Sequence, residues 1–339
     1  MFLFTYNSRC ISGLKSSKMA KPPPPLFSMK GSMEAVHSLA FKLDDKIPLL
    51  FAGTQSGHLH IWNLQVNREE AKFSFGTDPV LSIHYINKKL ITQTKVGLFG
   101  VWEEEDSKWI LRQSLPQNFL SFCKSVTSLL EAKPVLACAD SDSLIQIFSL
   151  ESYTNLFSLK DDDSAEKLGE VMALKFTTIE GKLFLLAVYE NCSLFLWDMQ
   201  RKTILSKLKI SEECPMALDY DESSMRGICG SSDENLTLFT IGESQDLKKK
   251  LVIKLTNPGI SCIKIRPDKK IVAVGCWDGM IRLYSWRSLK LLAVLDHHDS
   301  TIHDVCFSDR PVASWKTNIL LAAAGKDCKI SIWDLYNTT

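Results

Sequence analysis

A hairpin-like stretch of sixteen residues occurs twice in this 339-residue sequence, and it constrains the fold more than any other feature. The first copy, Ile271 to Trp286, reads IVAVGCWDGMIRLYSW, and the second, Leu320 to Leu335, reads LLAAAGKDCKISIWDL. In the first copy two apolar runs flank an Asp-Gly turn, which is the pattern of a β-hairpin. Internal repetition on this scale indicates a fold built from copies of one unit.

The same hairpin recurs, more weakly, through the rest of the chain. Each copy ends its second strand on a large aromatic residue, and successive aromatic residues are 40 to 49 positions apart, the period of a four-stranded propeller blade. These anchors are Trp62, Trp102, Phe148, Trp197, Phe239, Tyr284 and Trp333. Six positions before the anchors lie the turn residues Ser56, Val96, Asp142, Asn191, Asp233, Asp278 and Asp327. All except Val96 are small polar residues that cap turns with their own side chains. The sequence therefore predicts an all-β fold, a single seven-bladed propeller.

Further strands fit around these hairpins. An apolar inner strand precedes each hairpin, as in Ala35 to Phe41, and an outer strand follows most of them, as in Thr203 to Ile210 and Leu289 to Leu295. The seventh blade has no outer strand after its anchor. We predict that Leu26 to Gly31 takes that place and closes the ring, because a closed ring leaves no large sheet edge exposed.

The start of the chain differs in composition from the repeats. Residues 1–25 are expected to be a disordered extension, and residues 26–339 to be the propeller. Met1 to Lys18 is basic, contains serine and lacks acidic residues, which are weak marks of a mitochondrial transit peptide, while Met19 is an alternative start. The run Pro22 to Pro25 is an extended lead-in or an SH3-type ligand.

Composition places the chain among ordinary globular proteins. It is 45% hydrophobic and 23% charged, with a formal net charge of +1, so no broad field points to nucleic acid or an anionic membrane. The longest apolar stretch, around Leu183 to Tyr189, is too short to span a bilayer. The ten cysteines show no disulfide or C-x-x-C spacing and are expected to be reduced thiols.

Three charge runs are interpreted as solvated loops or strand edges. They are Glu103 to Asp106, Asp161 to Asp163, which a modification at Ser164 would extend, and Lys248 to Lys250.

One cluster resembles a catalytic or metal site: His297, His298, Asp299, His303 and Asp304. His298, however, stands just before an inner strand, where it can hydrogen-bond toward the turn residue Asp327 and thence the Trp333 indole. The structural interpretation is favoured. The sequence contains none of the nucleophile-elbow, phosphate-loop, zinc-protease or dinucleotide motifs, so we expect no enzyme, no cofactor and no metal.

The residue before each turn residue is expected to lie on one face, near the mouth of the central channel. These residues are Gln55, Lys95, Ser141, Glu190, Ser232, Trp277 and Lys326. Trp277 is the unusual one, because tryptophan is enriched at binding hot spots. Our hypothesis is that Trp277 anchors a protein partner, with Lys326, Gln55, Lys95 and Glu190 as further candidates. The alternative is that its ring lies flat over a neighbouring blade.

Trp197-Asp198 and Trp333-Asp334 resemble the WD-repeat family. More narrowly, LTNPGI (Leu255 to Ile260), the segment Ile265 to Leu295, the C-terminal LLAAAGKDCKISIWDLY, the proline-rich start after Met19 and GTQSGHLHIWNLQ (Gly53 to Gln65) resemble the guanine nucleotide-binding protein beta-subunit-like protein 1 family. That family resembles the ASTRA-associated WD-repeat proteins of fungi. The resemblance implies an adaptor for the co-chaperone machinery that matures phosphatidylinositol-3-kinase-related kinases, in cytoplasm and nucleus. The implied partners are therefore proteins, and the propeller is expected to be one subunit of a hetero-complex.

Two other protein-binding roles are weighed against the adaptor. A heterotrimeric G-protein β subunit needs an N-terminal helix that coils around γ, whereas Pro22 to Pro25 stands at this position and no heptads occur. A cullin-ligase substrate receptor often carries Trp-Asp-x-Arg, but here Arg201 comes one place late after Trp197-Asp198. Both alternatives stay open. An enzymatic propeller needs convergent polar groups at the channel mouth, and the turn-preceding set offers few charges.

Overall fold

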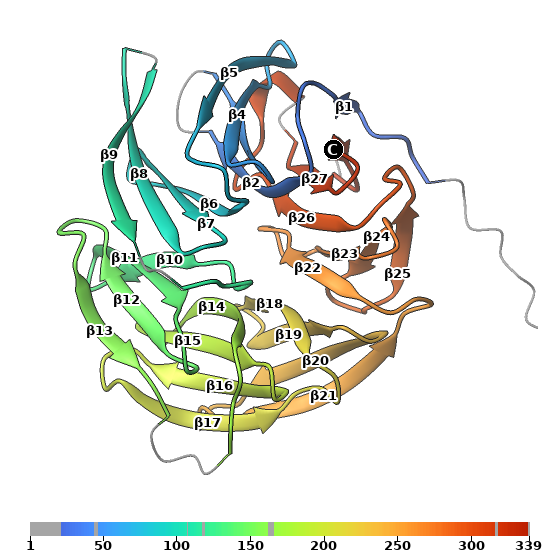
Figure 1. Ribbon diagram of the computed structural model, residues 1–339. Helices are drawn as coiled ribbons and strands as arrows, with labels where there is room; N and C mark the ends of the chain where they lie inside the picture. Colours follow the sequence, from blue (N-terminus) through green and yellow to red (C-terminus); the bar gives the residue numbers. More distant parts are fainter. Residues whose placement is uncertain are drawn as a thin grey trace, which may run out of the picture.

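In a computed structural model, residues 22–43, 47–106, 108–116, 119–161, 166–315 and 318–337 are described. Within these ranges, 28 strands form seven four-stranded antiparallel sheets, and one short 3-10 turn, η1 (Ala313–Trp315), is the only helical element. The sheets are arranged as blades around a central axis (Figure 1). The predicted seven-bladed propeller is confirmed.

In the first six blades the strands follow chain order from the innermost to the outermost. Blades 1 and 2 comprise β2 (Val36–Lys42), β3 (Leu49–Thr54), β4 (His58–Asn63) and β5 (Arg68–Ser74), then β6 (Val80–Ile86), β7 (Lys89–Thr94), β8 (Leu98–Glu105) and β9 (Lys108–Pro116). Blades 3 and 4 comprise β10 (Val126–Leu130), β11 (Lys133–Ala139), β12 (Ile145–Ser149) and β13 (Asn155–Leu159), then β14 (Val171–Ile179), β15 (Lys182–Tyr189), β16 (Ser193–Asp198) and β17 (Thr203–Lys209). Blades 5 and 6 comprise β18 (Pro215–Asp221), β19 (Arg226–Ser231), β20 (Asn235–Ile241) and β21 (Leu247–Lys254), then β22 (Ile260–Ile265), β23 (Ile271–Cys276), β24 (Ile281–Ser285) and β25 (Leu291–Leu295).

The seventh blade is completed from the other end of the chain. Its strands are β26 (Ile302–Phe307), β27 (Leu320–Gly325), β28 (Ile330–Asp334) and, outermost, β1 (Phe27–Met29). β1 pairs antiparallel with β28, with Phe27 opposite Ile332 and Met29 opposite Ile330, and lies beside the C-terminal strands in Figure 1. The predicted closure by the N-terminal segment is therefore confirmed.

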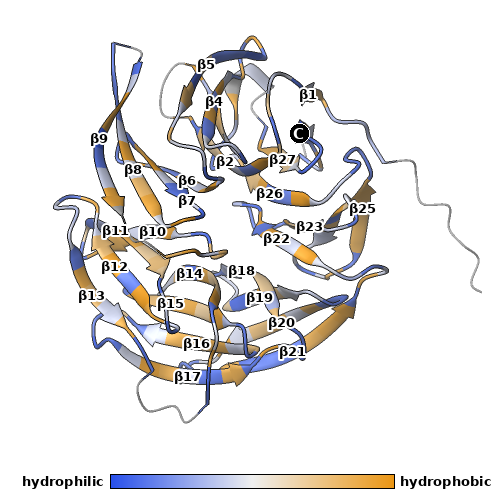
Figure 2. Cartoon of the chain, in the orientation of Figure 1, coloured by the Kyte–Doolittle hydropathy of each residue, from blue (hydrophilic) through white to orange (hydrophobic). Residues whose placement is uncertain are grey.

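The hydrophobic pattern explains why these residues form blades. The seven aromatic anchors are all buried, each on the third strand of its sheet, and the second strands are buried on both faces between neighbouring blades. Exposed and partly buried residues alternate along the outer strand β5, and Figure 2 shows hydrophilic and hydrophobic segments along the outer strands β17 and β21. Blade-to-blade packing of the inner layers supplies the hydrophobic core.

The charge runs and cysteines fit this arrangement in the described part of the chain. Lys248 to Lys250 are exposed on the outer strand β21. Glu103 and Glu105 form ion pairs with Arg112 across the β8–β9 hairpin. The nine cysteines within the described ranges are free thiols. Residues 1–18, Met19, Asp162, Asp163 and Ser164 lie outside the described residues. No helix in the described ranges has the length and apolarity needed to cross a membrane.

Candidate partner-binding face

A recurrent backbone hydrogen bond places the turn-preceding residues on one face. In six blades the N–H of that residue donates to the carbonyl of the residue just before the inner strand of the same blade, at 2.8 to 2.9 Å. These pairs are Gln55–Ala35, Lys95–Pro79, Glu190–Glu170, Ser232–Cys214, Trp277–Gly259 and Lys326–Thr301. The bond holds each turn beside the start of its inner strand, so all five candidate binding residues lie on the same face. We call this the turn face.

The turn residue Asp327 belongs to a hydrogen-bond network that stabilises blade 7. Asp327 contacts the His298 Nδ1 atom at 3.0 Å, and the Nε2 atom of His298 lies 2.8 Å from the Ser331 hydroxyl. That hydroxyl also accepts a hydrogen bond from the Trp333 indole at 2.8 Å. Burial alone would raise the pKa of Asp327, but its hydrogen bond to His298 and the charge of His298 lower it to about 2.

Ser331 is the member of this network that the sequence analysis did not include. Asp327 reaches Trp333 only through His298 and Ser331, because Ser331 is the direct acceptor for the indole. The sequence indicates this role only through position, because a residue two places before the anchor points to the same side of β28. In the structure Ser331 is fully buried.

The other turn aspartates differ in how they are held. Asp278 accepts two hydrogen bonds from the Arg282 guanidinium, at 3.1 and 2.7 Å, and one from the Asn257 amide at 2.9 Å. Asp233 accepts from the Asn235 N–H at 2.8 Å. Asp142 is exposed, with a φ of 55°, beside the acidic residue Glu170. Asp278 and Asp233 therefore have folding roles.

Trp277 is exposed and also held in place. Its side chain is 43% exposed, and a Cβ atom added to Gly259 would lie 2.2 Å from the indole Cδ2 and Cε3 atoms. One side of the ring therefore rests on the backbone that leads into its own blade, at a glycine with a φ of +92°. Thr301 connects this turn to the next blade, because its hydroxyl donates to the Trp277 carbonyl at 3.1 Å and its carbonyl accepts from Lys326 N–H. Thr301 thus links the turn that carries Trp277 in blade 6 to the turn that carries Lys326 in blade 7.

The remaining candidates lie elsewhere on the turn face. Gln55 is exposed on blade 1. Glu190 belongs to an acidic group with Asp142 and Glu170, and burial together with Glu190 and Asp142 raises the pKa of Glu170. The Lys95 ammonium lies 4.4 Å from the centre of the Phe122 ring on blades 2 and 3. The five candidates therefore do not form a single patch.

Near the axis, two histidines from different blades stack. The register of β2 and of β26 shifts at His37 and at His303, so each is the extra residue of a β-bulge, a device that re-aims a side chain. Their ring centroids are 4.3 Å apart. Burial, then His303, Lys124 and Lys95, lower the pKa of His37 to about 4, and burial also lowers the pKa of His303. Both rings are therefore neutral at pH 7.

Lys124 bridges blades that are far apart in sequence. It forms an ion pair with Asp304 at 2.8 Å and donates to the carbonyls of His37 and His303 at 3.1 and 3.2 Å. The residues suspected to form a catalytic or metal site therefore each contact a different partner. His297 contacts Ser28, His298 contacts Asp327, and Asp304 forms an ion pair with Lys124. Within the described ranges, no group of three or more histidine, cysteine or acidic side chains could hold a metal ion.

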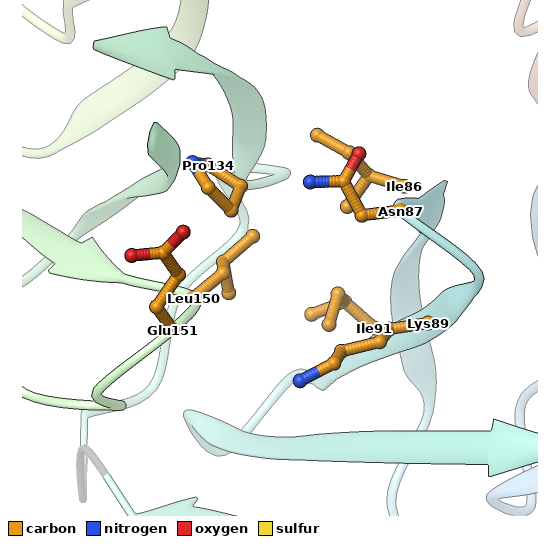
Figure 3. A pocket seen from close by; sticks show the side chains of 7 residues that line it. All are labelled: Ile86, Asn87, Lys89, Ile91, Pro134, Leu150 and Glu151. Carbon is orange, nitrogen blue, oxygen red and sulfur yellow. The ribbon is translucent and has the colours of Figure 1, made fainter. Parts of the chain in front are cut away.

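A cleft of about 210 Å³ opens between blades 2 and 3, away from the turn-preceding residues. Figure 3 shows Ile86, Asn87, Lys89 and Ile91 on one side, and Pro134, Leu150 and Glu151 on the other. The Lys89 ammonium in this cleft already has two partners, because it donates a hydrogen bond to the Tyr153 hydroxyl at 2.5 Å and forms an ion pair with Glu103 at 3.3 Å. The rest of the lining is mostly apolar, with Ile86, Ile91, Pro134 and Leu150 facing the cleft beside Asn87 and Glu151.

Comparison with known proteins agrees with this geometry. The profile of the WD domain, G-beta repeat family matches residues 249–285, which run from β21 to β24, and residues 289–334, which run from β25 to β28. The chain is 33% identical to the guanine nucleotide-binding protein subunit beta-like protein 1 of Mus musculus over 324 residues, covering 93% of this chain and 97% of the relative. It belongs to that family.

More distant relatives also match along nearly the whole chain. The ASTRA-associated protein 1 of Schizosaccharomyces pombe is 24% identical over 383 residues, covering 93% of this chain and 99% of the relative. The corresponding protein of Schizosaccharomyces japonicus is 21% identical over 372 residues, with the same coverage of both chains. The chain is thus a WD-repeat scaffold. WD-repeat propellers of this kind generally act without catalysis, by holding other proteins.

Proposed function

We propose that this chain is a non-catalytic adaptor that assists the co-chaperone-dependent maturation of phosphatidylinositol-3-kinase-related kinases. The observation that carries the proposal is the similarity to proteins named as associated with ASTRA. The alignments cover 93% of this chain and 99% of each relative. An adaptor of this kind would work in cytoplasm and nucleus and would contribute to DNA-damage and growth signalling.

The exposed and fixed ring of Trp277 supports a binding role. A tryptophan that rests on a glycine backbone loses little conformational entropy when a partner covers its free side. The segment before blade 6 is also held in place, because the Arg282 guanidinium donates hydrogen bonds to the Thr256 hydroxyl at 3.0 Å and to the Asp278 carboxylate. An exposed tryptophan that is already held in place is typical of a binding hot spot.

The test is a tagged pull-down from native cell extract with identification of the proteins that co-purify. Wild type is compared with Trp277→Ala and with Leu291→Ala, which truncates a side chain of similar exposure (40%) on the outer strand β25. We expect the kinases and their co-chaperones with wild type and Leu291→Ala, and their loss with Trp277→Ala. Thermal melting of all three proteins checks that the fold survives.

Other outcomes contradict specific parts of the proposal. Recovery of cullin-ligase adaptors or a G-protein γ subunit in place of kinases would overturn the adaptor role. Recovery of the same kinases with Trp277→Ala would support the adaptor role but contradict the hypothesis that Trp277 binds the partner.

A further inference from the structure

A second exposed apolar surface lies on the turn face, between blades 2 and 3. Val96 is 40% exposed, Leu120 56% and Phe122 61%. Val96 occupies the tight-turn position at which the other blades place a small polar residue. We call Val96, Leu120 and Phe122 the blade 2/3 patch.

Leu120 and Phe122 belong to residues 119–125, which hydrogen bonds hold in place. The Ser121 N–H donates to the Lys95 carbonyl at 3.0 Å, which fixes the loop beside the turn that carries Val96. Side chains alternate along the loop: Ser121 and Cys123 are buried, whereas Leu120 and Phe122 point outward. The Gln93 amide also donates to the Cys123 carbonyl at 3.1 Å. The exposure of Leu120 and Phe122 is therefore built into the fold.

The charge beside the patch is positive. The Lys95 ammonium lies 4.4 Å from the Phe122 ring centre, and Lys95 has no carboxylate partner within ion-pair distance in the described part of the chain. Asp78 comes just before Pro79, whose carbonyl accepts a hydrogen bond from the Lys95 N–H, but Asp78 and Lys95 form no ion pair in the described part of the chain. Lys124, two residues beyond Phe122, already pairs with Asp304. Lys95 is thus the cation that the patch offers to a ligand.

We propose that the blade 2/3 patch binds an acidic linear segment of a protein partner. A bulky apolar side chain of that segment covers Leu120 and Phe122, and a neighbouring carboxylate pairs with Lys95. The surface is separate from Trp277, because blades 2 and 3 lie across the axis from blade 6 (Figure 1).

Photo-crosslinking in the native complex tests the chemistry of the partner segment directly. Phe122→p-benzoylphenylalanine places the crosslinker in the patch, and Leu251→p-benzoylphenylalanine is the control, because Leu251 is 48% exposed on the outer strand β21. Mass spectrometry then identifies the crosslinked peptide. We expect the Phe122 position, and not the Leu251 position, to crosslink to a segment in which acidic residues flank an apolar one.

Binding of a synthetic peptide with the crosslinked sequence provides the second measurement. Phe122→Ala and Lys95→Ala are each expected to weaken its affinity at least tenfold, and the effect of Lys95→Ala should shrink as salt rises. Leu251→Ala should leave the affinity unchanged. A crosslink to RNA, a crosslinked segment without carboxylates, or an unchanged affinity with Lys95→Ala would overturn the proposal. These readouts hold whichever protein supplies the segment, so they do not depend on the kinase-maturation role.

Discussion

Met29→Ala is expected to weaken the closure of the ring. Met29 is fully buried, whereas Phe27 and Ser28 in the same strand are only partly buried. Its side chain belongs to a core cluster with Ile330 and Ile332 of the partner strand β28. Truncating a buried methionine to alanine costs about 2 to 5 kcal/mol, because contacts are lost and a cavity remains. At roughly 2 cal/mol/K of unfolding entropy per residue, a chain of this length loses about 1.5 °C of melting temperature per kcal/mol, so we expect a decrease of about 3 to 8 °C.

Deleting residues 26–31 should have a larger effect. The deletion removes Met29 and also the pairing with β28, including the hydrogen bond from Leu26 N–H to the Ile332 carbonyl at 2.8 Å. Each backbone hydrogen bond contributes about 1 kcal/mol net, so the total decrease should reach roughly 10 °C. The uncovered edge of β28 should also promote aggregation.

Scanning calorimetry at one protein concentration and one scan rate compares these variants with wild type. Leu26→Ala is the matched control, because Leu26 lies next to the same strand but is 47% exposed, and it should melt within about 1 °C of wild type. A deletion variant that melts like wild type would refute the closure by β1. Equal losses for Leu26→Ala and Met29→Ala would refute the role assigned to Met29 burial.

Two further predictions concern the network of Asp327, His298, Ser331 and Trp333. Ser331→Ala leaves the Trp333 N–H without its acceptor and should destabilise the protein by about 1 to 3 kcal/mol in urea unfolding, whereas the exposed control Ser288→Ala should not. Because the pKa of Asp327 is lowered to about 2 in the folded state, from about 4 when unfolded, its contribution to stability is present above pH 4 and is lost as the pH falls toward 2. Asp327→Asn should therefore be less stable at pH 7 and lose less stability between pH 4 and pH 2 than wild type, while Asp309→Asn, at a side chain 66% exposed, should follow wild type.

The blades could be predicted from sequence because each is specified locally. An aromatic anchor and a tight turn six residues earlier belong to one hairpin, so their spacing survives even where the rest of the repeat diverges, as in blade 3 around Phe148. Closure by β1 followed from a count of strands combined with the cost of an open sheet edge. Both predictions need only the spacing of residues within one hairpin and the requirement that the ring of blades be closed.

The contacts between blades were not accessible in the same way. Lys124 reaches His303 across 179 sequence positions, and the stacking of His37 on His303 depends on two β-bulges that apolar spacing does not reveal. The blade 2/3 patch left one trace in the sequence, the apolar Val96 at a turn position. The outward direction of Leu120 and Phe122, however, depends on the hydrogen bond from Ser121 to Lys95.

The ring gives these separate surfaces a common frame. Trp277 and Val96 lie on turns that equivalent backbone hydrogen bonds hold beside the inner strands, and the Ser121–Lys95 hydrogen bond holds Leu120 and Phe122 beside the turn of Val96. The separation of the two surfaces is therefore set by the inner strands. A partner with two suitable segments could engage both surfaces and gain avidity without any new contact, provided that its linker spans the axis. Two partners that each use one surface would instead be brought together by the scaffold. In either case Trp277→Ala and Phe122→Ala should act independently, because they lie on opposite sides of the axis and the described contacts of each are confined to neighbouring turns and loops.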